Sequence, residues 1–237
     1  MRAIPSSKLR IFETEWDLSR RNGGTLLSEQ TNLALERCEG DWCFYLQADE
    51  VLHEDDYDLI VRAMRRNLDR KQVLGLWFRY LHFLGDYKIR NALGYHTSTR
   101  IIRNGMSLKS IRDASKFGWS NDRALYERPF SRSQPTGARI FHYTDVRAPR
   151  SMTDKFESMR RLYDDGLDGE RRPREELTDW NFDFSACVPY HGPHPGAMAA
   201  RIAAKDWETP AFRHTPLWRN KTFLKGRLRK AGLWPKA

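Results

Sequence analysis

The sequence predicts an α/β fold in which a mixed sheet is flanked by helices. The first observation is an alternation between residues 42 and 83, where a strand-like run, an amphipathic helical pattern and another strand-like run follow one another. The second is a set of further β-type runs and helical patterns after residue 96. The third is size, because 237 residues with 40% hydrophobic side chains are enough for one domain with a sizeable core.

Five elements are expected in the first half of the chain. Residues 9–13 (LRIFE) have the composition of a short strand, and residues 25–37 carry apolar side chains at helical spacing. Residues 42–46 (WCFYL) are apolar on both faces, which is typical of a buried, parallel strand. Residues 54–68 form an amphipathic helix with acids in the first turn and arginines near the end, as the helix dipole favours. Residues 73–83 are again strand-like.

The second half begins with an expected β-hairpin over residues 97–111. Asn104-Gly105 lies between two β-type runs there, and this dipeptide is the strongest short hairpin signal. A further strand is expected over residues 137–144, and helices are expected over 151–163 and 196–205. Residues 164–178 are expected to form a polar surface loop.

The net charge of +10 is concentrated at the end of the chain. Residues 218–237 contain seven Lys and Arg and no acid, whereas the remainder has 34 basic against 31 acidic residues. Trp, Phe and Leu side chains interleave with these charges, which suits an anionic membrane surface. Contact with phosphates and a solvated terminal helix are the alternatives. The mildly basic body and the lack of a nucleic-acid motif argue against nucleic-acid binding.

The sequence also indicates where the protein resides. No apolar run approaches the roughly 20 residues of a membrane-spanning helix, and MRAIPSSKLRIF lacks the apolar core of a signal peptide. The three cysteines, Cys38, Cys43 and Cys187, form neither a disulfide framework nor a zinc motif. We therefore expect a cytosolic protein with buried or half-buried thiols.

A cluster of carboxylates follows the predicted strand at 42–46. Glu54, Asp55 and Asp56 are explained by the first turn of the next helix, where acids favour the dipole. Asp49 and Glu50 instead lie just past the strand end, where α/β sheets bind ligands. Carboxylates there can hold Mg²⁺ or Mn²⁺, and such an ion can bridge a diphosphate and stabilise a nucleotide leaving group.

The segment LSEQTNLALERCEGDWCFYLQADEVLHEDD is similar to the central segment of bacterial family 2 glycosyltransferases. In that family a helix containing TN-A precedes a strand that ends in an acidic signature, which QADE resembles. The similarity continues through RYLHFLGDY, STRIIRNG, RIFHYTDVRAPRSMTDK and HPGAMAARI, and so covers residues 9–205. The resemblance implies a GT-A fold, with a nucleotide-binding α/β sheet followed by an acceptor-binding half. It also implies inverting transfer from a nucleotide-activated sugar, with a divalent cation.

The resemblance assigns roles to three residues of QADE. Asp49 is the carboxylate for the metal and the diphosphate. Gln47 occupies the first signature position, where the family usually has Asp, so the first ligand is neutral here and the dependence on Mg²⁺ or Mn²⁺ that the resemblance implies is open to question. Glu50 occupies the last position, as a second carboxylate that reaches the metal or the sugar.

The resemblance also points to residues further along the chain. An inverting transferase needs a carboxylate to accept the proton of the acceptor hydroxyl. Asp113 is the best match for this base and Asp122 the second, and the alternative for Asp113 is a turn aspartate. His142 matches a late histidine that completes the metal shell, or it is a hydrogen-bonded core histidine. His82 faces the acceptor pocket or packs in the core.

The chain departs from the family at its beginning, where only one predicted strand and one predicted helix precede QADE. We therefore expect a GT-A-like domain over residues 1–205 that lacks its first strands, followed by a basic, aromatic extension over 206–237. An unpaired sheet edge, an uncovered sheet face, and weak or absent donor binding are expected of such a chain. The favoured function is sugar transfer to a cell-envelope glycan or lipid-linked acceptor, with the tail at the inner membrane face. The alternative is a degenerate domain without catalytic activity.

Overall fold

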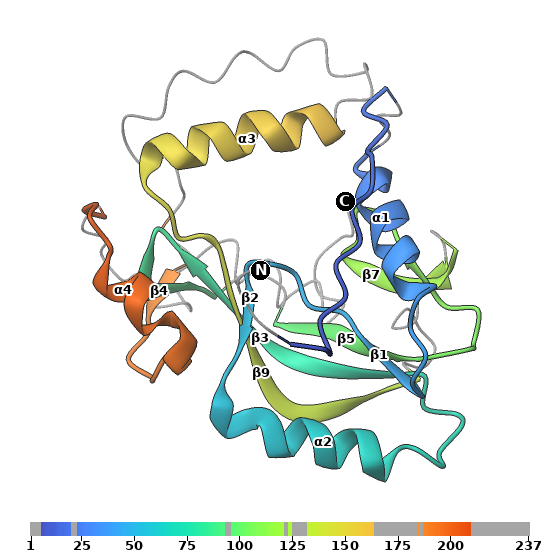
Figure 1. Ribbon diagram of the computed structural model, residues 1–237. Helices are drawn as coiled ribbons and strands as arrows, with labels where there is room; N and C mark the ends of the chain where they lie inside the picture. Colours follow the sequence, from blue (N-terminus) through green and yellow to red (C-terminus); the bar gives the residue numbers. More distant parts are fainter. Residues whose placement is uncertain are drawn as a thin grey trace, which may run out of the picture.

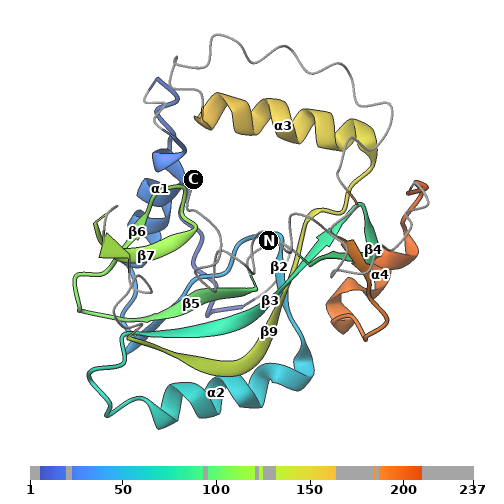
Figure 2. The same cartoon turned by 180° about the vertical axis from the view of Figure 1, so that it is seen from behind.

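A computed structural model describes residues 6–19, 23–92, 96–120, 123–124, 132–163, 184 and 187–209. The chain forms a mixed α/β structure around a curled sheet (Figure 1). In Figure 1, helix α2 (Tyr57–Arg66) lies below the sheet and α3 (Pro149–Tyr163) crosses above it, and the view from behind shows the same arrangement (Figure 2). The predicted class, a mixed sheet flanked by helices, is confirmed at this level.

Among the described residues, the main sheet has seven strands and is mostly antiparallel. Five of them follow one another in the order β1 (Trp42–Phe44), β5 (Thr97–Arg103), β3 (Gly75–Leu84), β4 (Asp86–Asn91) and β10 (Cys187–Pro189). The long strand β9 (Ser133–Asp145) pairs in parallel with β3, and β2 (Glu50–Leu52) pairs antiparallel with β9. Strand β3 is therefore the centre of the sheet, and the predicted strands at 73–83 and 137–144 are both confirmed.

Helix α2 closes one face of this sheet. A 3₁₀ turn, η1 (Glu54–Asp56), leads into it, with acids at the start and arginines in the last turn. Its apolar side chains Ile60 and Ala63 are buried against residues of β3 and β9, among them Phe78 and Ile140. The amphipathic helix predicted over 54–68 thus forms, because this apolar stripe is removed from water by the sheet.

Helix α1 (Thr25–Leu35) is joined to a smaller sheet of β6 (Lys109–Ile111), β7 (Lys116–Ser120) and β8 (Arg123–Ala124). The amide of Asn32 in α1 donates to the carbonyl of Ser110 at 3.0 Å and accepts from its N–H at 2.7 Å. The helix predicted over 25–37 is confirmed, with Leu26 and Ser28 as its buried residues.

The C-terminal part of the described chain packs beside the β3–β4 turn. Turn η3 (Gly196–Met198) and the short helix α4 (Ala199–Ala203) correspond to the helix predicted over 196–205, and α3 to that predicted over 151–163. Met198 and Ile202 join a cluster with Phe83 and Phe141. Gly85, which makes the β3–β4 turn, accepts hydrogen bonds on its carbonyl from Trp207 at 3.0 Å and Thr209 at 3.1 Å.

One strand prediction for the first half of the chain is wrong, and a second is correct only in part. Residues 9–13 form no strand, and Leu9, Ile11 and Phe12 are exposed, so this segment does not contribute its apolar side chains to the core of the described residues. The strand predicted over 42–46 is only Trp42–Phe44, and it pairs antiparallel with β5 instead of parallel. As the first strand in the order, it buries Cys43 but leaves Phe44 exposed, so the expected burial on both faces is absent here.

The hairpin predicted around Asn104-Gly105 is also wrong. Strand β5 already lies between β1 and β3, and it uses both edges of its backbone there. Strand β6 pairs with β7 instead. The Asn104 amide donates to the carbonyls of Cys38 and Gly40 at 2.8 and 2.9 Å, so this residue ties the chain back to the start of β1.

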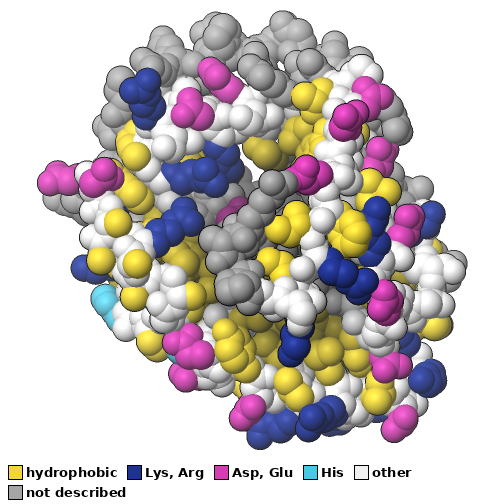
Figure 3. Space-filling view, viewed as in Figure 1, with side chains coloured by type: hydrophobic (Ala, Val, Ile, Leu, Met, Phe, Trp, Pro, Cys, Tyr) yellow, Lys and Arg dark blue, Asp and Glu magenta, His cyan; other side chains and the backbone are white. Residues whose placement is uncertain are grey.

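Three sequence expectations lie outside the described residues: the loop over 164–178, the basic tail over 218–237 and Asp122. Within the described part, no helix combines the length and apolar character needed to cross a membrane. On the face shown in Figure 3, acidic and basic side chains are interspersed. This distribution agrees with the nearly balanced charge of residues 1–217.

Candidate active site

Asp49 lies in the loop between β1 and β2, and the N–H of Tyr143 on β9 donates to its carbonyl at 2.9 Å. Its carboxylate is 29% exposed, and Oδ2 lies 3.6 Å from Nε2 of His142. Burial by itself raises the pKa of Asp49, but hydrogen bonds with His142 and Thr144 outweigh it and hold the pKa well below its usual range. At neutral pH, Asp49 is therefore a partly exposed carboxylate facing an imidazole.

His142 belongs to a row of charged and polar side chains that runs along β9. Its Nδ1 lies 3.0 Å from Nδ1 of His82 on β3, and Nε2 of His82 lies 2.9 Å from Oδ2 of Asp145. Lys155 of α3 donates to Oδ1 of Asp145 at 2.6 Å. Asp49, His142, His82, Asp145 and Lys155 therefore form a continuous row, which we call the His–Asp row.

Two strand pairings bring this row together. Glu50 on β2 and His82 on β3 are both Cα partners of His142, one on each side of β9.

Burial raises the pKa of Asp145, but His82 and Lys155 outweigh it and lower the pKa below the usual range. Asp145 is thus ionised at neutral pH and acts only as a hydrogen-bond acceptor.

Glu50 is enclosed within the protein, with a side chain that is 0% exposed. Its carboxylate accepts from Nη2 of Arg100 at 2.6 Å, from Nε of Arg100 at 3.0 Å and from the Tyr80 hydroxyl at 2.7 Å. The N–H of Gln47 also donates to it at 3.2 Å. Both oxygens are therefore engaged inside the chain, and this geometry gives Glu50 the role of anchoring the turn that carries Asp49.

The side chain of Gln47 joins the same buried group. Its amide N–H donates to the Tyr45 hydroxyl at 3.1 Å, and its amide oxygen accepts from Arg100 at 3.5 Å. Burial lowers the pKa of Arg100, but Glu50 outweighs it and raises the pKa above the usual value, so the guanidinium stays charged. Gln47 therefore contacts Arg100, whereas Asp49 contacts His142.

Asp113, the predicted general base, lies in the turn between β6 and β7 of the smaller sheet. Its neighbours Arg112 and Ala114 both have φ of 58°, in the left-handed region. This placement matches the turn aspartate that the sequence offered as the alternative. His142 lies on β9 of the main sheet and Asp49 in the loop just before β2 of that sheet, whereas Asp113 belongs to a turn of the smaller sheet.

Asp49 and His142 have the chemistry of a two-ligand site for a divalent cation. Ligands of Mg²⁺ or Mn²⁺ lie about 2.1 Å from the ion, so neighbouring ligand atoms are about 3 Å or slightly more apart. The 3.6 Å between Oδ2 and Nε2 fits this separation. In the described part of the chain, no group of three or more His, Cys, Asp and Glu side chains is arranged around one ion. Phosphate oxygens of a ligand would have to complete the shell.

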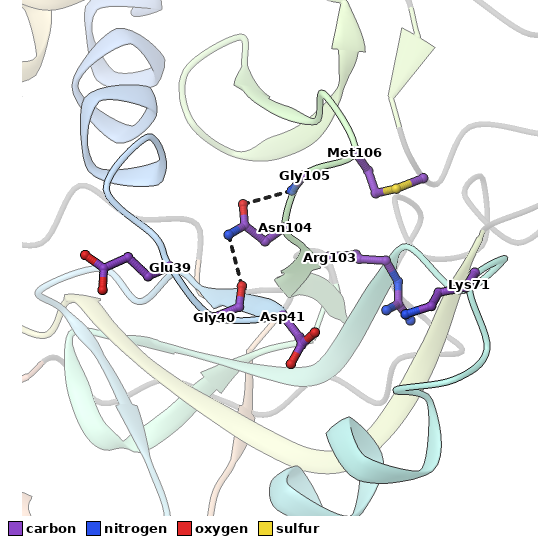
Figure 4. A pocket seen from close by; sticks show the side chains of 8 residues that line it. All are labelled: Glu39, Gly40, Asp41, Lys71, Arg103, Asn104, Gly105 and Met106. Atoms are coloured by element: carbon purple, nitrogen blue, oxygen red, sulfur yellow. Dashed lines mark hydrogen bonds between the residues drawn. The ribbon is translucent and has the colours of Figure 1, made fainter.

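A pocket of about 400 Å³ lies at the other end of β1 (Figure 4). It is lined by Glu39, Gly40, Asp41, Lys71, Arg103, Asn104, Gly105 and Met106. The guanidinium of Arg103 is used structurally, since it donates to the carbonyls of Asn67 and Val73 and lies over the Trp42 ring. No residue predicted for the site lines this pocket, and we assign it no role.

Sequence reasoning missed the charged members Arg100, Asp145 and Lys155 of these networks. Asp145 and Lys155 fall inside the quoted segment RIFHYTDVRAPRSMTDK, but nothing in their spacing indicates that Asp145 contacts both His82 and Lys155. Chemically, the site offers the partly exposed carboxylate of Asp49 and a ring nitrogen of His142, which can bind the same cation. The buried ion pair of Glu50 and Arg100 lies beneath the turn that carries Asp49. No protein-family model, no curated protein and no solved structure matches this chain.

Proposed function

We propose that this chain is an inverting glycosyltransferase of the GT-A type that transfers a sugar from a nucleotide-sugar donor. The observation that supports this most is the contact of Asp49 with His142 at 3.6 Å. The resemblance to family 2 glycosyltransferases named these two residues, from distant segments, as ligands of one metal. Asp49, in the loop just before β2, lies next to His142 on β9, and its side chain is partly exposed.

In this proposal Asp49 and His142 hold Mg²⁺ or Mn²⁺, which supplies positive charge against the diphosphate leaving group. The pair of Glu50 and Arg100 keeps the turn of Asp49 in place. The resemblance names Asp113 as the base that accepts the proton of the acceptor hydroxyl, but Asp113 lies in the β6–β7 turn of the smaller sheet, so an acceptor would have to bring the two sheets' residues to one reaction. The acceptor is a cell-envelope glycan or a lipid-linked sugar. The enzyme acts in the cytoplasm, with residues 218–237 against the inner membrane face.

One observation favours a second candidate, a degenerate transferase domain that binds without catalysing transfer. Gln47 replaces a carboxylate of the signature and is directed at Tyr45 and Arg100, while Glu50 is enclosed. Only Asp49 of QADE then remains as a charged ligand for a cation. A site with a single carboxylate binds divalent ions weakly, which would leave a nucleotide-binding surface with little catalytic power.

Calorimetry and transfer assays with a panel of UDP- and GDP-sugars, with and without Mn²⁺, separate the two candidates. The transferase predicts donor binding that requires Mn²⁺ and is lost in Asp49→Ala. Asp55→Asn is the matched control, because Asp55 is a nearby acid with a 72% exposed side chain in the first turn of the helix. An unchanged transfer rate in Asp49→Ala defeats the assignment. Donor binding without turnover supports the second candidate.

A further inference from the structure

Two of the three cysteines lie in contact with each other. Cys38 follows helix α1 and Cys43 belongs to strand β1, and a hydrogen bond joins their side chains. Both pack in one apolar cluster with Leu74 and Ile102, in which Cys43 is 4% exposed and Cys38 is half-buried. Both are free thiols, so the two sulfur atoms of a reduced pair are already neighbours in the folded chain.

The turn between these cysteines is held in place by Asn104. The side-chain amide of Asn104 donates to the carbonyls of Cys38 and Gly40 at 2.8 and 2.9 Å, and its backbone N–H donates to the carbonyl of Asp41 at 3.0 Å. These bonds fix the path of the chain from α1 into β1. The loss of chain entropy that closing a loop requires has therefore been met by folding, before any bond between the sulfur atoms forms.

The two thiols differ in their surroundings. Burial raises the pKa of Cys43, and the adjacent Cys38 raises it further, so Cys43 is a protonated thiol at neutral pH. Cys38 is the more exposed of the two. The third cysteine, Cys187, is 0% exposed and lies in a separate cluster with Leu84 and Ile89. A thiol reagent in solution therefore reaches Cys38 first.

We propose that Cys38 and Cys43 are an oxidisable pair, which a low-molecular-weight disulfide such as oxidised glutathione converts into a disulfide bond that links the turn after helix α1 to strand β1. Cys38 loses its proton and attacks one sulfur of oxidised glutathione, whose S–S bond breaks, and the glutathione that leaves takes up a proton. Cys43 then loses its proton, attacks the Cys38 sulfur and displaces the second glutathione, which is protonated in turn. Two protein thiols are oxidised, and one glutathione disulfide is reduced to two thiols.

The contact between the cysteines favours the second step. Once Cys38 carries a glutathione, it no longer bears the charge that opposes ionisation of Cys43, and Cys43 is the neighbouring sulfur. The new bond also fixes the turn between the cysteines. Glu39, Gly40 and Asp41 of this turn form part of the pocket wall in Figure 4, so oxidation restricts that wall. This modification site goes beyond the proposed transferase activity and does not depend on it.

Mass spectrometry of the full chain tests the pair directly. The reduced, folded protein is incubated with excess oxidised glutathione, and the remaining thiols are alkylated after unfolding. Trypsin leaves both cysteines in one peptide, residues 38–62. We expect this peptide to carry no alkyl group and to be two hydrogen atoms lighter than the dithiol, while Cys187 is alkylated. A peptide that keeps both thiols, a lasting glutathione adduct on Cys38, or a bond to Cys187 would overturn the proposal.

Three variants separate the roles of the sulfur atoms. Cys43→Ser removes the second attack, so Cys38 should accumulate as the glutathione adduct. Cys38→Ser leaves only the buried thiol of the pair, so both the adduct and the disulfide should be lost. Cys187→Ala is the control and should form the disulfide as the wild type does. An adduct on Cys43 in Cys38→Ser, formed as fast as the wild-type disulfide, would contradict the order of attack.

Urea unfolding of the oxidised and reduced wild type shows whether the bond fits the folded chain. A disulfide restricts the unfolded chain, so the oxidised protein should have the higher urea midpoint, and dithiothreitol should return it to the reduced value. A lower midpoint after oxidation would show that the bond distorts the native contact, and would overturn the proposal. This comparison uses no substitution, so together with the wild-type peptide map it decides the matter if a variant does not fold.

Discussion

The carboxylate of Glu50 and the guanidinium of Arg100 form a buried ion pair. Oε1 lies 2.6 Å from Nη2, and the two side chains are 0% and 2% exposed. Tyr80 donates a further hydrogen bond to Glu50 at 2.7 Å. Two charges this deep in a protein are tolerated only when they are paired, so each residue depends on the other.

Glu50→Gln should therefore destabilise the protein by about 3–5 kcal/mol, since it leaves the Arg100 charge buried without a partner. Urea unfolding measures this change. Glu39→Gln is the control, because Glu39 pairs with Arg10 at the surface with a 77% exposed side chain and should change stability by less than about 1 kcal/mol. The double variant Glu50→Leu, Arg100→Met should recover most of the loss. A single variant as stable as wild type would contradict the buried-pair account.

Asn32→Ala should loosen helix α1 from the smaller sheet. The substitution removes two hydrogen bonds to Ser110, each worth about 0.5–1.5 kcal/mol. Faster hydrogen exchange at the amides of α1 and of β6 is the expected result. Glu36→Ala, at an exposed position at the end of the same helix, is the control. Equal exchange rates in the two variants would show that these bonds do not hold the helix.

His194 should make the protein less stable in mildly acidic solution. Burial lowers the pKa of His194, so the folded state favours the neutral ring, whose Nδ1 lies 2.7 Å from the Tyr143 hydroxyl. The unfolded chain binds the proton more readily, so this stability is present above about pH 6.5 and is lost as pH falls towards the lowered pKa. Urea midpoints between pH 8 and pH 5 should fall less in His194→Gln than in wild type. His191→Gln, at an exposed position, should behave like wild type.

Protonation of Asp56 should destabilise the folded protein at a lower pH than protonation of His194 does. Burial raises the pKa of Asp56, but the bonds from Arg139 outweigh it and lower the pKa. The stabilisation is therefore present above the ordinary aspartate pKa of about 3.9 and is lost as pH falls through the lowered value. Asp56→Asn should reduce the dependence of unfolding free energy on pH below 4. Asp58→Asn, an exposed neighbour on α2, should not, and equal slopes would refute the assignment.

Gly85 and Gly105 form a matched pair for a packing test. Their φ angles are 71° and 72°, but a Cβ at Gly85 would lie 3.1 Å from Thr209 and 3.3 Å from Phe184, whereas at Gly105 nothing lies within 4 Å. Gly105→Ala should cost about 1–2 kcal/mol from backbone strain alone. Gly85→Ala should cost a further ~1–3 kcal/mol, because its neighbours must move. Equal midpoints of urea unfolding would show that the β3–β4 turn is not closely packed.

Much of the local structure could be predicted from the sequence. The spacing of Ile60 and Met64 indicated the amphipathic helix α2, and the runs at 73–83 and 137–144 indicated β3 and β9. Such patterns succeed because an amphipathic helix or a buried strand must direct its own apolar residues to one side. The pattern of apolar residues within one strand does not indicate which other strand will pair with it. Asn104-Gly105 failed for this reason, since its turn chemistry was right but both edges of β5 were already paired.

The candidate site divides in the same way. Asp49 and His142 were named from the resemblance, but the row that supports His142 was not. His82 reaches His142 only because β3 and β9 pair in parallel with these two residues in register, and Lys155 reaches Asp145 from a separate helix.

By itself, therefore, the sequence determined the helices, the long strands and an acidic turn after β1. Only the tertiary structure decided which side chains form hydrogen bonds and ion pairs with one another. The reason is that strand register depends on hydrogen bonds and packing between segments that are distant in the chain.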